Sequence, residues 1–354
     1  MSISLGHAQQ LLAALLIGVI TTSPVEADDR GLAPYPAPTF ARGIVLSSWD
    51  GSYSNEAAWR AHLRRFHALG INWIEIMTFA HQPRVEGPEI HPAPRSRWPS
   101  QFIQAARAEG FKILLKPHVW SREFYDGSGR WRGSIRMKSE AKWREWFAQY
   151  EAFIMREAAL AAETGVDMFC VGLEYVEATK RTESWRRVIA QVRRVFTGPL
   201  TYAADGNHEL GHLQFWDALD VIGVDAYFNL GPKDDLFGLG PMFGWIKPLT
   251  QIEELATRYK RPVIFTEAGF PSIVDATLRP WQWPKGTETV DLQGQADAYY
   301  SLLSALTPKP WFRGVFWWKW YEKPERGVSH LHDYSPRGKP AETVLRAWYQ
   351  TRNR

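Results

Sequence analysis

Short apolar runs alternate with longer amphipathic segments along the chain from Arg42 onward. Each run is bounded by polar residues or glycine and is apolar throughout, which is typical of parallel strands covered on both faces. We expect eight strands, at residues 44–49, 73–80, 112–119, 168–174, 200–205, 221–227, 263–270 and 314–321.

The segments between the expected strands carry apolar residues at helical spacing. They predict helices near residues 55–69, 98–109, 140–163, 182–195, 212–217, 250–260, 291–306 and 340–351. Eight alternations of strand and helix predict an α/β fold, a single (β/α)8 TIM barrel with extended βα loops. The active site of such a barrel lies where its strands end, and neither an internal repeat nor a second domain remains to be placed.

Three expected loops are longer than a simple connection requires, at about 120–139, 228–249 and 271–290. They follow the third, sixth and seventh strands, on the face of the barrel that carries chemistry. Their tryptophan and glycine content suits the rim of a cleft, and disordered insertions are the alternative.

The N-terminus carries the stretch "LLAALLIGVITTSPVEADD". Its apolar part is too short to span a bilayer and has the length of a signal core, and the small residues around Ala27 suit a signal peptidase. No Lys or Arg precedes this core. We expect a signal peptide at 1–27, a proline-rich linker at 28–41, a catalytic domain at 42–354, and a secreted or periplasmic protein without a membrane span.

Composition changes this picture in two ways. The chain holds 18 Trp, more than packing usually requires, and such rings are suited to stacking on sugars. Its net charge of +4 comes from scattered basic residues among nearly as many acids, so we expect no nucleic-acid partner. A lone cysteine, Cys170, allows neither an intramolecular disulfide nor a thiolate metal cluster.

Two carboxylates end apolar strands, Glu174 after "MFCVGL" and Glu267 in "RPVIFTEAGFPS". The fourth and seventh strands of a barrel lie on opposite sides of its mouth, so the two side chains can approach each other. A separation of about 5 to 5.5 Å suits a retaining glycosidase, in which one carboxylate attacks and the other transfers protons. An ion pair at the barrel rim is the alternative for each residue alone.

The other strand ends supply polar and aromatic groups suited to binding a sugar. Lys116 and His118 alternate on one strand and both can donate hydrogen bonds to hydroxyls. Tyr227 can hydrogen-bond Glu267, and Trp318 can stack on a sugar ring. The remaining candidates for substrate contact are Trp49, Asp50, Asp205 and Asn207.

Competing chemistries find little support in these residues. The histidines are dispersed, so we expect no metal site, and no Gly-x-Gly-x-x-Gly follows a strand to bind a dinucleotide cofactor. Lys116 stands beside His118 rather than alone, unlike a Schiff-base lysine. We therefore expect no cofactor.

The motifs "SSWDGSY", "LLKPHVW", "FCVGLEY", "GVDAYF", "FTEAGF" and "GVFWWKWY" resemble, in their order and strand positions, the clan A glycoside hydrolases, most closely family 113, the β-mannanase family. The resemblance runs from about Arg42 to the C-terminus. It implies that Glu174 is the acid/base, that Glu267 is the nucleophile, and that Tyr227 supports Glu267. Leu173 stands where many clan A enzymes place an asparagine that binds the sugar 2-hydroxyl.

Together these features predict an exported, monomeric, retaining β-glycoside hydrolase acting on a polysaccharide or oligosaccharide, and specifically an endo-β-1,4-mannanase. Two alternatives stay open. One is a clan A glycosidase acting on another β-glycan. The other is an exported TIM barrel that binds carbohydrate without turning it over.

Overall fold

The apolar runs form a closed parallel sheet at the centre of the fold. The computed structural model describes residues 39–46, 56–94, 98–232, 240–321 and 328–351, all within one compact unit. Nearly all strand residues are buried, because helices cover one face of the sheet and the barrel interior lies on the other. The parallel strands are β1 (Ala41–Leu46), β2 (Trp73–His81), β4 (Lys112–Trp120), β5 (Met168–Leu173), β6 (Leu200–Asp205), β7 (Val221–Asp225), β8 (Val263–Ala268) and β9 (Phe312–Trp320).

Hydrogen bonding runs around the sheet in the order β1-β9-β8-β7-β6-β5-β4-β2, and β1 also pairs with β2. This second pairing closes the ring, which confirms the predicted (β/α)8 barrel. A short strand, β3 (His91–Pro92), adds to β2 in antiparallel orientation. It was not predicted, because two residues are too few for a periodic pattern.

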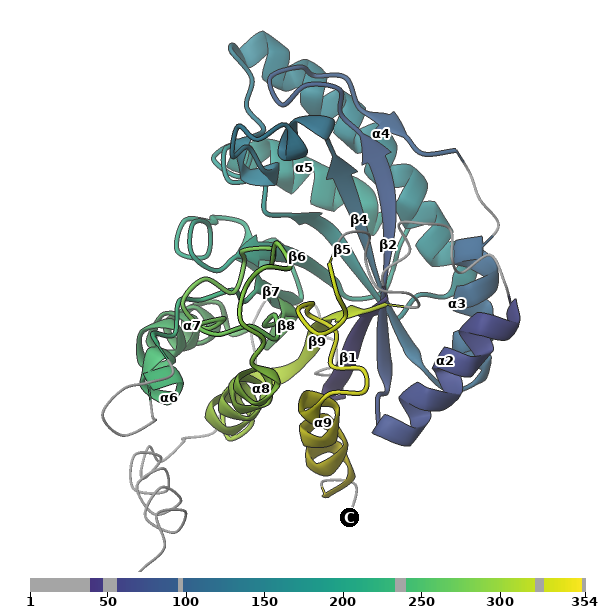
Figure 1. The fold of residues 1–354 in the computed structure, drawn as a ribbon. Helices are drawn as coiled ribbons and strands as arrows, with labels where there is room; N and C mark the ends of the chain where they lie inside the picture. The colour runs from purple at the N-terminus through teal and green to yellow at the C-terminus, as the bar shows by residue number, and fades with distance from the viewer. Residues whose placement is uncertain (1–38, 47–55, 95–97, 233–239, 322–327, 352–354) are drawn as a thin grey trace, which may run out of the picture. The chain divides into compact units, whose positions relative to one another are not determined.

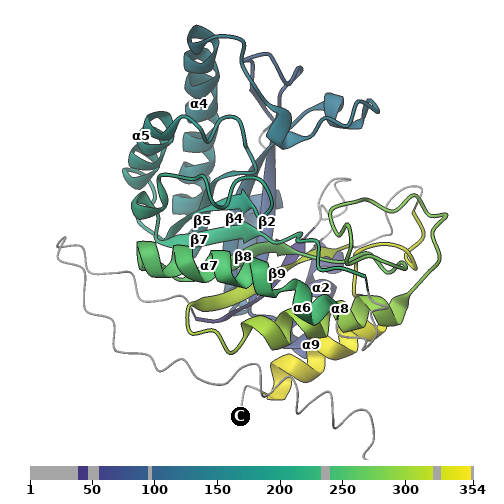
Figure 2. The ribbon, with the colours of Figure 1, turned by 90° about the vertical axis from the view of Figure 1, so that its left-hand side faces the viewer.

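The helices lie outside the strands (Figures 1 and 2). They are α2 (Glu56–Leu69), α3 (Trp98–Ala108), α4 (Glu140–Thr164), α5 (Thr182–Arg193), α6 (Gly240–Gly244), α7 (Ile246–Tyr259), α8 (Leu292–Leu306) and α9 (Pro340–Thr351). The hydroxyl of Ser139 caps the start of α4 by accepting from the Lys142 N–H. None of the helices in the described ranges is long and apolar enough to cross a bilayer.

Two helix predictions need correction. The segment 212–217 forms turns and a short 3-10 helix, η4 (Trp216–Ala218), instead of an α-helix. Its aromatic residues Phe215 and Trp216 are buried, and Phe215 stacks on Trp185 of α5, so packing determined its shape. Helix α7 begins earlier than predicted, because Pro248 lies in its first turn, where a proline is tolerated.

A glycine lies at the seam where β9 meets β1. Gly314 pairs with Ala41 and has a φ of +124°, a backbone conformation that other residues rarely adopt. An added Cβ would lie 2.2 Å from the Ala41 carbonyl oxygen. Only glycine therefore lets the first and last strands of the barrel approach this closely.

Candidate active site

A pocket of about 910 Å³ holds both predicted catalytic carboxylates. Strand ends and the residues just after them supply one part of its lining, and the loops that follow β4, β8 and β9 supply the rest. The strand-end residues include His118, Glu174, Asp205, Asn207, His208, Tyr227, Glu267, Trp318 and Lys319, and the loop residues include Arg130, Trp131, Arg132, Trp281 and Trp283. Glu174 and Glu267, which the sequence led us to expect across the mouth of the barrel from each other, thus line one pocket.

Glu267 lies near the end of β8, and both of its carboxylate oxygens are held. The Lys116 ammonium donates to Oε1 at 2.6 Å, and the Tyr227 hydroxyl donates to Oε2 at 2.8 Å. The side chain is almost wholly buried. Two donors from β4 and from the turn after β7 therefore fix the rotation of this carboxylate.

The sequence predicted that Lys116 reaches the mouth of the barrel and contacts the sugar. In the structure it lies deeper, inside the barrel. Its side chain is fully buried, and its ammonium lies 2.9 Å from Glu75 Oε1 and 3.6 Å from Asp225 Oδ1 as well as contacting Glu267. Burial alone would lower the pKa of Lys116, but the three surrounding carboxyls together raise it. Lys116 therefore supports Glu267 from below.

The same crowding acts on the two other acids. Burial raises the pKa of Glu75 well above its usual value, although the charge of Lys116 acts to lower it. Burial is also the main cause that raises the pKa of Asp225. One ammonium cannot balance three carboxylates in a dry site. The raised pKa values of Glu75 and Asp225 favour their neutral forms and so reduce the excess negative charge.

Glu75, His118 and Glu267 offer three possible metal-ligand atoms within 4.8 Å of one another. The Lys116 ammonium already contacts the carboxylates of Glu75 and Glu267. A metal ion would have to displace this buried charge, so we assign Lys116 as the cation of the cluster.

Glu174 follows β5 directly and turns into the pocket. Its φ is 51°, in the left-handed region that residues other than glycine seldom occupy, and its N–H donates to the Ala203 carbonyl at 2.9 Å. The next residue, Tyr175, is buried: its N–H donates to the Tyr202 hydroxyl, and its own hydroxyl accepts from the Val119 N–H. These contacts fix the turn that aims Glu174.

The Glu174 carboxyl meets a guanidinium inside the pocket. Arg132, from the 3-10 helix η3 (Arg132–Ser134) in the loop after β4, donates through Nη1 to Glu174 Oε2. Burial nevertheless raises the pKa of Glu174 to about 8, opposed by Arg132 and assisted by the negative charge of Glu267. A carboxylic acid that is still protonated near neutral pH is suited to general acid catalysis.

His118 is buried beside this pair. Burial, followed by the nearby charge of Arg132, lowers its pKa well below its usual value, so the imidazole is neutral. Arg132 Nη2 lies 3.2 Å from Nδ1 of His118, which must accept because a guanidinium only donates. The proton of the neutral ring therefore lies on Nε2, which has no hydrogen-bond partner within the described part of the chain.

Asp205 organises the turn that follows β6. Its Oδ1 accepts from the backbone N–H groups of Asn207 and His208, and the His208 ring nitrogen Nδ1 lies 2.8 Å away. The Asn207 amide donates in turn to the Tyr227 carbonyl at 2.9 Å. The three predicted residues Asp205, Asn207 and Tyr227 thus form one connected wall of the pocket.

Aromatic side chains line the outer part of the pocket. Trp318 is 8% exposed, whereas Trp281 and Trp283, from the loop after β8, are 48% and 39% exposed. The Lys319 ammonium lies over the rings of Trp283 and Trp318 at 4.9 and 4.7 Å.

The predicted loops differ in what they add to this rim. The loops at 120–139 and 271–290 both contribute to the rim, whereas 228–249 adds no described residue to the pocket lining. Trp49 and Asp50 lie outside the described residues.

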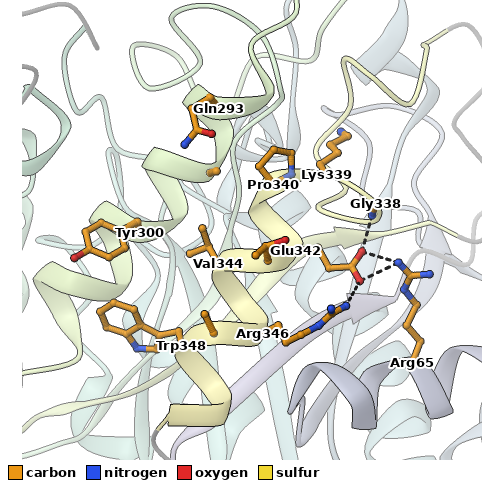
Figure 3. Close-up of a pocket in the computed structure, with 13 residues that line it drawn as sticks. Arg65, Gln293, Tyr300, Gly338, Lys339, Pro340, Glu342, Val344, Arg346 and Trp348 are labelled. Atoms are coloured by element: carbon orange, nitrogen blue, oxygen red, sulfur yellow. Dashed lines mark hydrogen bonds and ion pairs between the residues drawn. The ribbon is translucent and has the colours of Figure 1, made fainter. Parts of the chain in front are cut away.

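A second pocket, also of about 910 Å³, lies along α8 and α9 (Figure 3). Its acid, Glu342, binds Arg65 of α2, Arg346 and the Gly338 N–H. This carboxylate already has three donors and no second acid facing it among the residues lining the pocket. The arrangement is that of a structural ion-pair network, so the pocket with Glu174 and Glu267 is the candidate active site.

Comparison with known proteins points to one enzyme family. The model of Glycoside Hydrolase Family 113 matches residues 44–339. The structure is similar to that of the GH113 β-mannanase AaManA from Alicyclobacillus acidocaldarius in complex with ManMIm, with a TM-score of 0.77 and 29% identity over 89% of this chain and 98% of that one. A GH113 β-1,4-mannanase solved as a complex is 30% identical, covers 89% and 100% of the two chains, and has a TM-score of 0.77.

More distant matches show the fold alone. A β-glucuronidase from Ruminococcus gnavus has a TM-score of 0.62 at 11% identity, and the match covers 88% of this chain and 50% of that one. No curated protein sequence matches the chain.

Proposed function

Because the chain belongs to Glycoside Hydrolase Family 113 and is a retaining glycoside hydrolase, we propose that it cleaves a β-1,4-linked mannan or glucomannan internally, by double displacement. Glu267 is the nucleophile and Glu174 the acid/base in this proposal. The mannan substrate is supported by the β-mannanases of similar structure.

The main observation behind the proposal is that the two carboxyls of one pocket have different surroundings. Glu267 accepts hydrogen bonds from an ammonium and a phenol, which hold its carboxylate in a fixed orientation. Burial raises the pKa of Glu174 to about 8, so it holds a proton near neutral pH. Two acids whose environments differ in this way are suited to opposite roles.

In the first step Glu267 attacks the anomeric carbon while Glu174 gives its proton to the departing glycosidic oxygen. The C–O bond to the leaving sugar breaks, and a covalent glycosyl ester forms on Glu267. In the second step Glu174, now a carboxylate, takes a proton from water as that water attacks the same carbon. Glu267 is released, and the two inversions leave the configuration retained.

The pocket wall supplies groups for holding the sugar. Trp318 lines the same pocket as Glu267, and polar atoms come from Asp205 at the end of β6 and Asn207 in the turn after it. Directed polar groups discriminate between sugars more strongly than an apolar surface does. We propose that Trp281 and Trp283, which are exposed, stack on sugars farther from the bond that breaks.

Single substitutions of the two carboxylates test the roles. Glu174→Ala should reduce turnover of polysaccharide by about 10²- to 10⁴-fold and largely spare the first step on aryl glycosides with activated leaving groups. Azide should then rescue Glu174→Ala with a product of retained configuration and Glu267→Ala with a product of inverted configuration. Near wild-type turnover in both variants would refute the assignment.

Product analysis on a panel of β-linked polysaccharides tests the substrate. We expect mannan or glucomannan to yield mannobiose and mannotriose, with little mannose at early times. Cleavage of another β-glycan alone would remove the mannanase assignment and leave the mechanism standing. Binding without cleavage of any glycan would instead favour a carbohydrate-binding barrel.

We also propose that the protein is exported as a monomer and loses residues 1–27. The apolar segment and the small residues before Asp28 support export and cleavage. N-terminal sequencing of protein recovered from the periplasm or medium should begin at Asp28. An intact Met1 on the protein in those fractions would contradict cleavage.

A further inference from the structure

Arg132 contacts Glu174, the proposed proton donor, although double displacement does not require a guanidinium at this position. The role of this contact therefore has to be explained. Arg132 donates through Nη1 to Oε2 of Glu174, and its side chain is 12% exposed. An arginine beside a general acid favours the charged carboxylate, which is the form unable to donate a proton. Its presence therefore has to serve a purpose other than keeping Glu174 protonated.

The structure fixes Arg132 from both ends. The backbone of η3 is held by hydrogen bonds from Ser134 N–H to the Trp131 carbonyl and from Ile135 N–H to the Arg132 carbonyl, and the Ile135 side chain is fully buried. At the other end, Nη2 donates to the neutral ring of His118. A protonated imidazole would repel the guanidinium, so the lowered pKa of His118 keeps this contact attractive.

We propose that Arg132 is a positioning residue that holds Glu174 by Oε2, so that Oε1 carries the proton transferred to and from the substrate. This inference rests on the proposed role of Glu174. Oε2 is occupied by a group that can only donate, so a proton cannot reside there without breaking that contact. The proton is thereby confined to the other oxygen.

The same contact serves the second half of the reaction. After proton transfer Glu174 is a carboxylate in a buried site, where an unpaired charge is costly. Arg132 is then its counter-charge and lowers the pKa that burial has raised, so the group can exchange its proton in both directions. The other charged groups facing Glu174 are Glu267 and Asp205, which raise its pKa, and Lys116, which lowers it. Glu174 is in turn one of the charges that raise the pKa of Asp225 on β7.

The loop offers a matched control in Arg130. It lines the same pocket, but its guanidinium pairs with Glu123 at 3.2 Å and is 44% exposed. Arg130→Gln removes the same charge from the same loop without touching Glu174. Arg132→Gln removes both the charge and the hydrogen bond, and Arg132→Lys keeps the charge but loses the planar fork.

The first measurement follows the Glu174 carboxyl directly. We propose ¹³C NMR titration of protein labelled at the glutamate δ-carbon, with Glu174→Gln identifying the resonance. Removing the cation that favours the carboxylate should raise the midpoint by at least about one pH unit in Arg132→Gln, whereas Arg130→Gln should leave it in place. An unchanged midpoint in Arg132→Gln, or equal shifts in both variants, would overturn the proposal.

The second measurement separates positioning from a general loss of structure. Arg132→Gln should lower kcat/KM on a β-linked oligosaccharide by about 10²-fold and lower it far less on an activated aryl glycoside, which needs little proton donation. The alkaline limb of the profile should move to higher pH, because activity is lost when Glu174 ionises. Arg132→Lys should keep the limb near its wild-type position, with an intermediate rate.

Equal losses on both substrates with an unmoved limb would show a structural role for Arg132 and overturn the inference. The proposed function fails in a different way, namely if Glu174→Gln still cleaves the oligosaccharide at the wild-type rate.

Discussion

At the scale of single residues, the buried cluster around Lys116 holds three carboxyl groups and only one ammonium. Glu75, Asp225 and Glu267 surround one ammonium, and the first two have pKa values raised mainly by burial. A neutral Glu75 already behaves like an amide. Lys116, in contrast, is the one positive charge that reaches the Glu267 carboxylate among the described residues, and removing it leaves buried acids without a counter-charge.

Substitution at Lys116 and at Glu75 should therefore have very different effects. Lys116→Met should lower the free energy of unfolding by about 3 to 5 kcal/mol, the usual result of breaking a buried ion pair from one side. Glu75→Gln should lower it by less than about 1 kcal/mol, because the amide imitates the protonated acid. Urea unfolding at neutral pH measures both, and equal losses would show that Glu75 is charged in the folded protein.

Residues found from the sequence were those whose position along a strand already implied a role. Glu174 and Glu267 end apolar strands, and Tyr227 follows another, so parallel strands bring them together. Glu75 carries a similar signal, as a lone acid inside "NWIEIMTFA", which could have been used. Arg132 carries none, because its loop also holds Arg122, Arg130 and Arg136, and only the conformation of the loop decides which one enters the pocket.

At the scale of secondary structure, the seam between β1 and β9 depends on a backbone position more than on side-chain packing. Gly314 combines a φ of +124° with direct contact to the Ala41 backbone. Gly110, which follows α3, has a φ of +87° with no atom within 4 Å of a Cβ built on it. A substitution at Gly110 therefore tests backbone strain alone, whereas one at Gly314 tests strain together with steric overlap.

Gly110→Ala should cost about 1 kcal/mol of stability, from the strain of a left-handed conformation alone. Gly314→Ala should cost at least about 3 kcal/mol, because overpacking against the Ala41 backbone adds to that strain. Chemical unfolding of the two variants beside the wild type gives both values. Similar losses of stability in the two variants would mean that β1 and β9 can move apart at little cost to accept the added Cβ.

Prediction from pattern succeeded best where tertiary packing and local periodicity agree. The strands at 200–205 and 112–119 lie within one residue of their predicted bounds, because a buried parallel strand needs an unbroken apolar run. The helix expected at 212–217 is absent because that segment is too short to stabilise a helix and its aromatic rings pack beneath α5 instead.

At the scale of the whole molecule, several buried carboxyls bind protons more tightly in the folded state than in the unfolded chain. Burial raises the pKa of Glu174 and of Glu209 to about 8, and shifts Glu75 and Asp225 in the same direction. Between the usual glutamate value, about 4.5, and about 8 the folded state thus holds more protons. Stability must then fall as pH rises through this window.

Glu209→Gln should make the loss of stability between pH 5 and pH 8 smaller than in the wild type. Glu209 is buried beneath the turn after β6, where it accepts from the Tyr202 hydroxyl and the Asp205 N–H, and an amide there cannot ionise. Glu288→Gln is the control, because backbone N–H groups lower the pKa of Glu288, which is ionised in both states across this range. Unfolding free energies at the two pH values decide the matter, and an unchanged slope in Glu209→Gln would contradict the prediction.

The closed ring has a consequence for synthesis. β1 begins at Ala41 and receives its last partner only when β9, which begins at Phe312, has left the ribosome. At about 5 to 20 residues per second, the roughly 270 residues between them take from about 14 to about 54 seconds to make. During that time β1 keeps one open edge, and Trp318 has not joined Glu174 and Glu267. Synthesis of β9 therefore closes the barrel and brings Trp318 to the two carboxyls in one event, and a chain cut short before β9 would lack both.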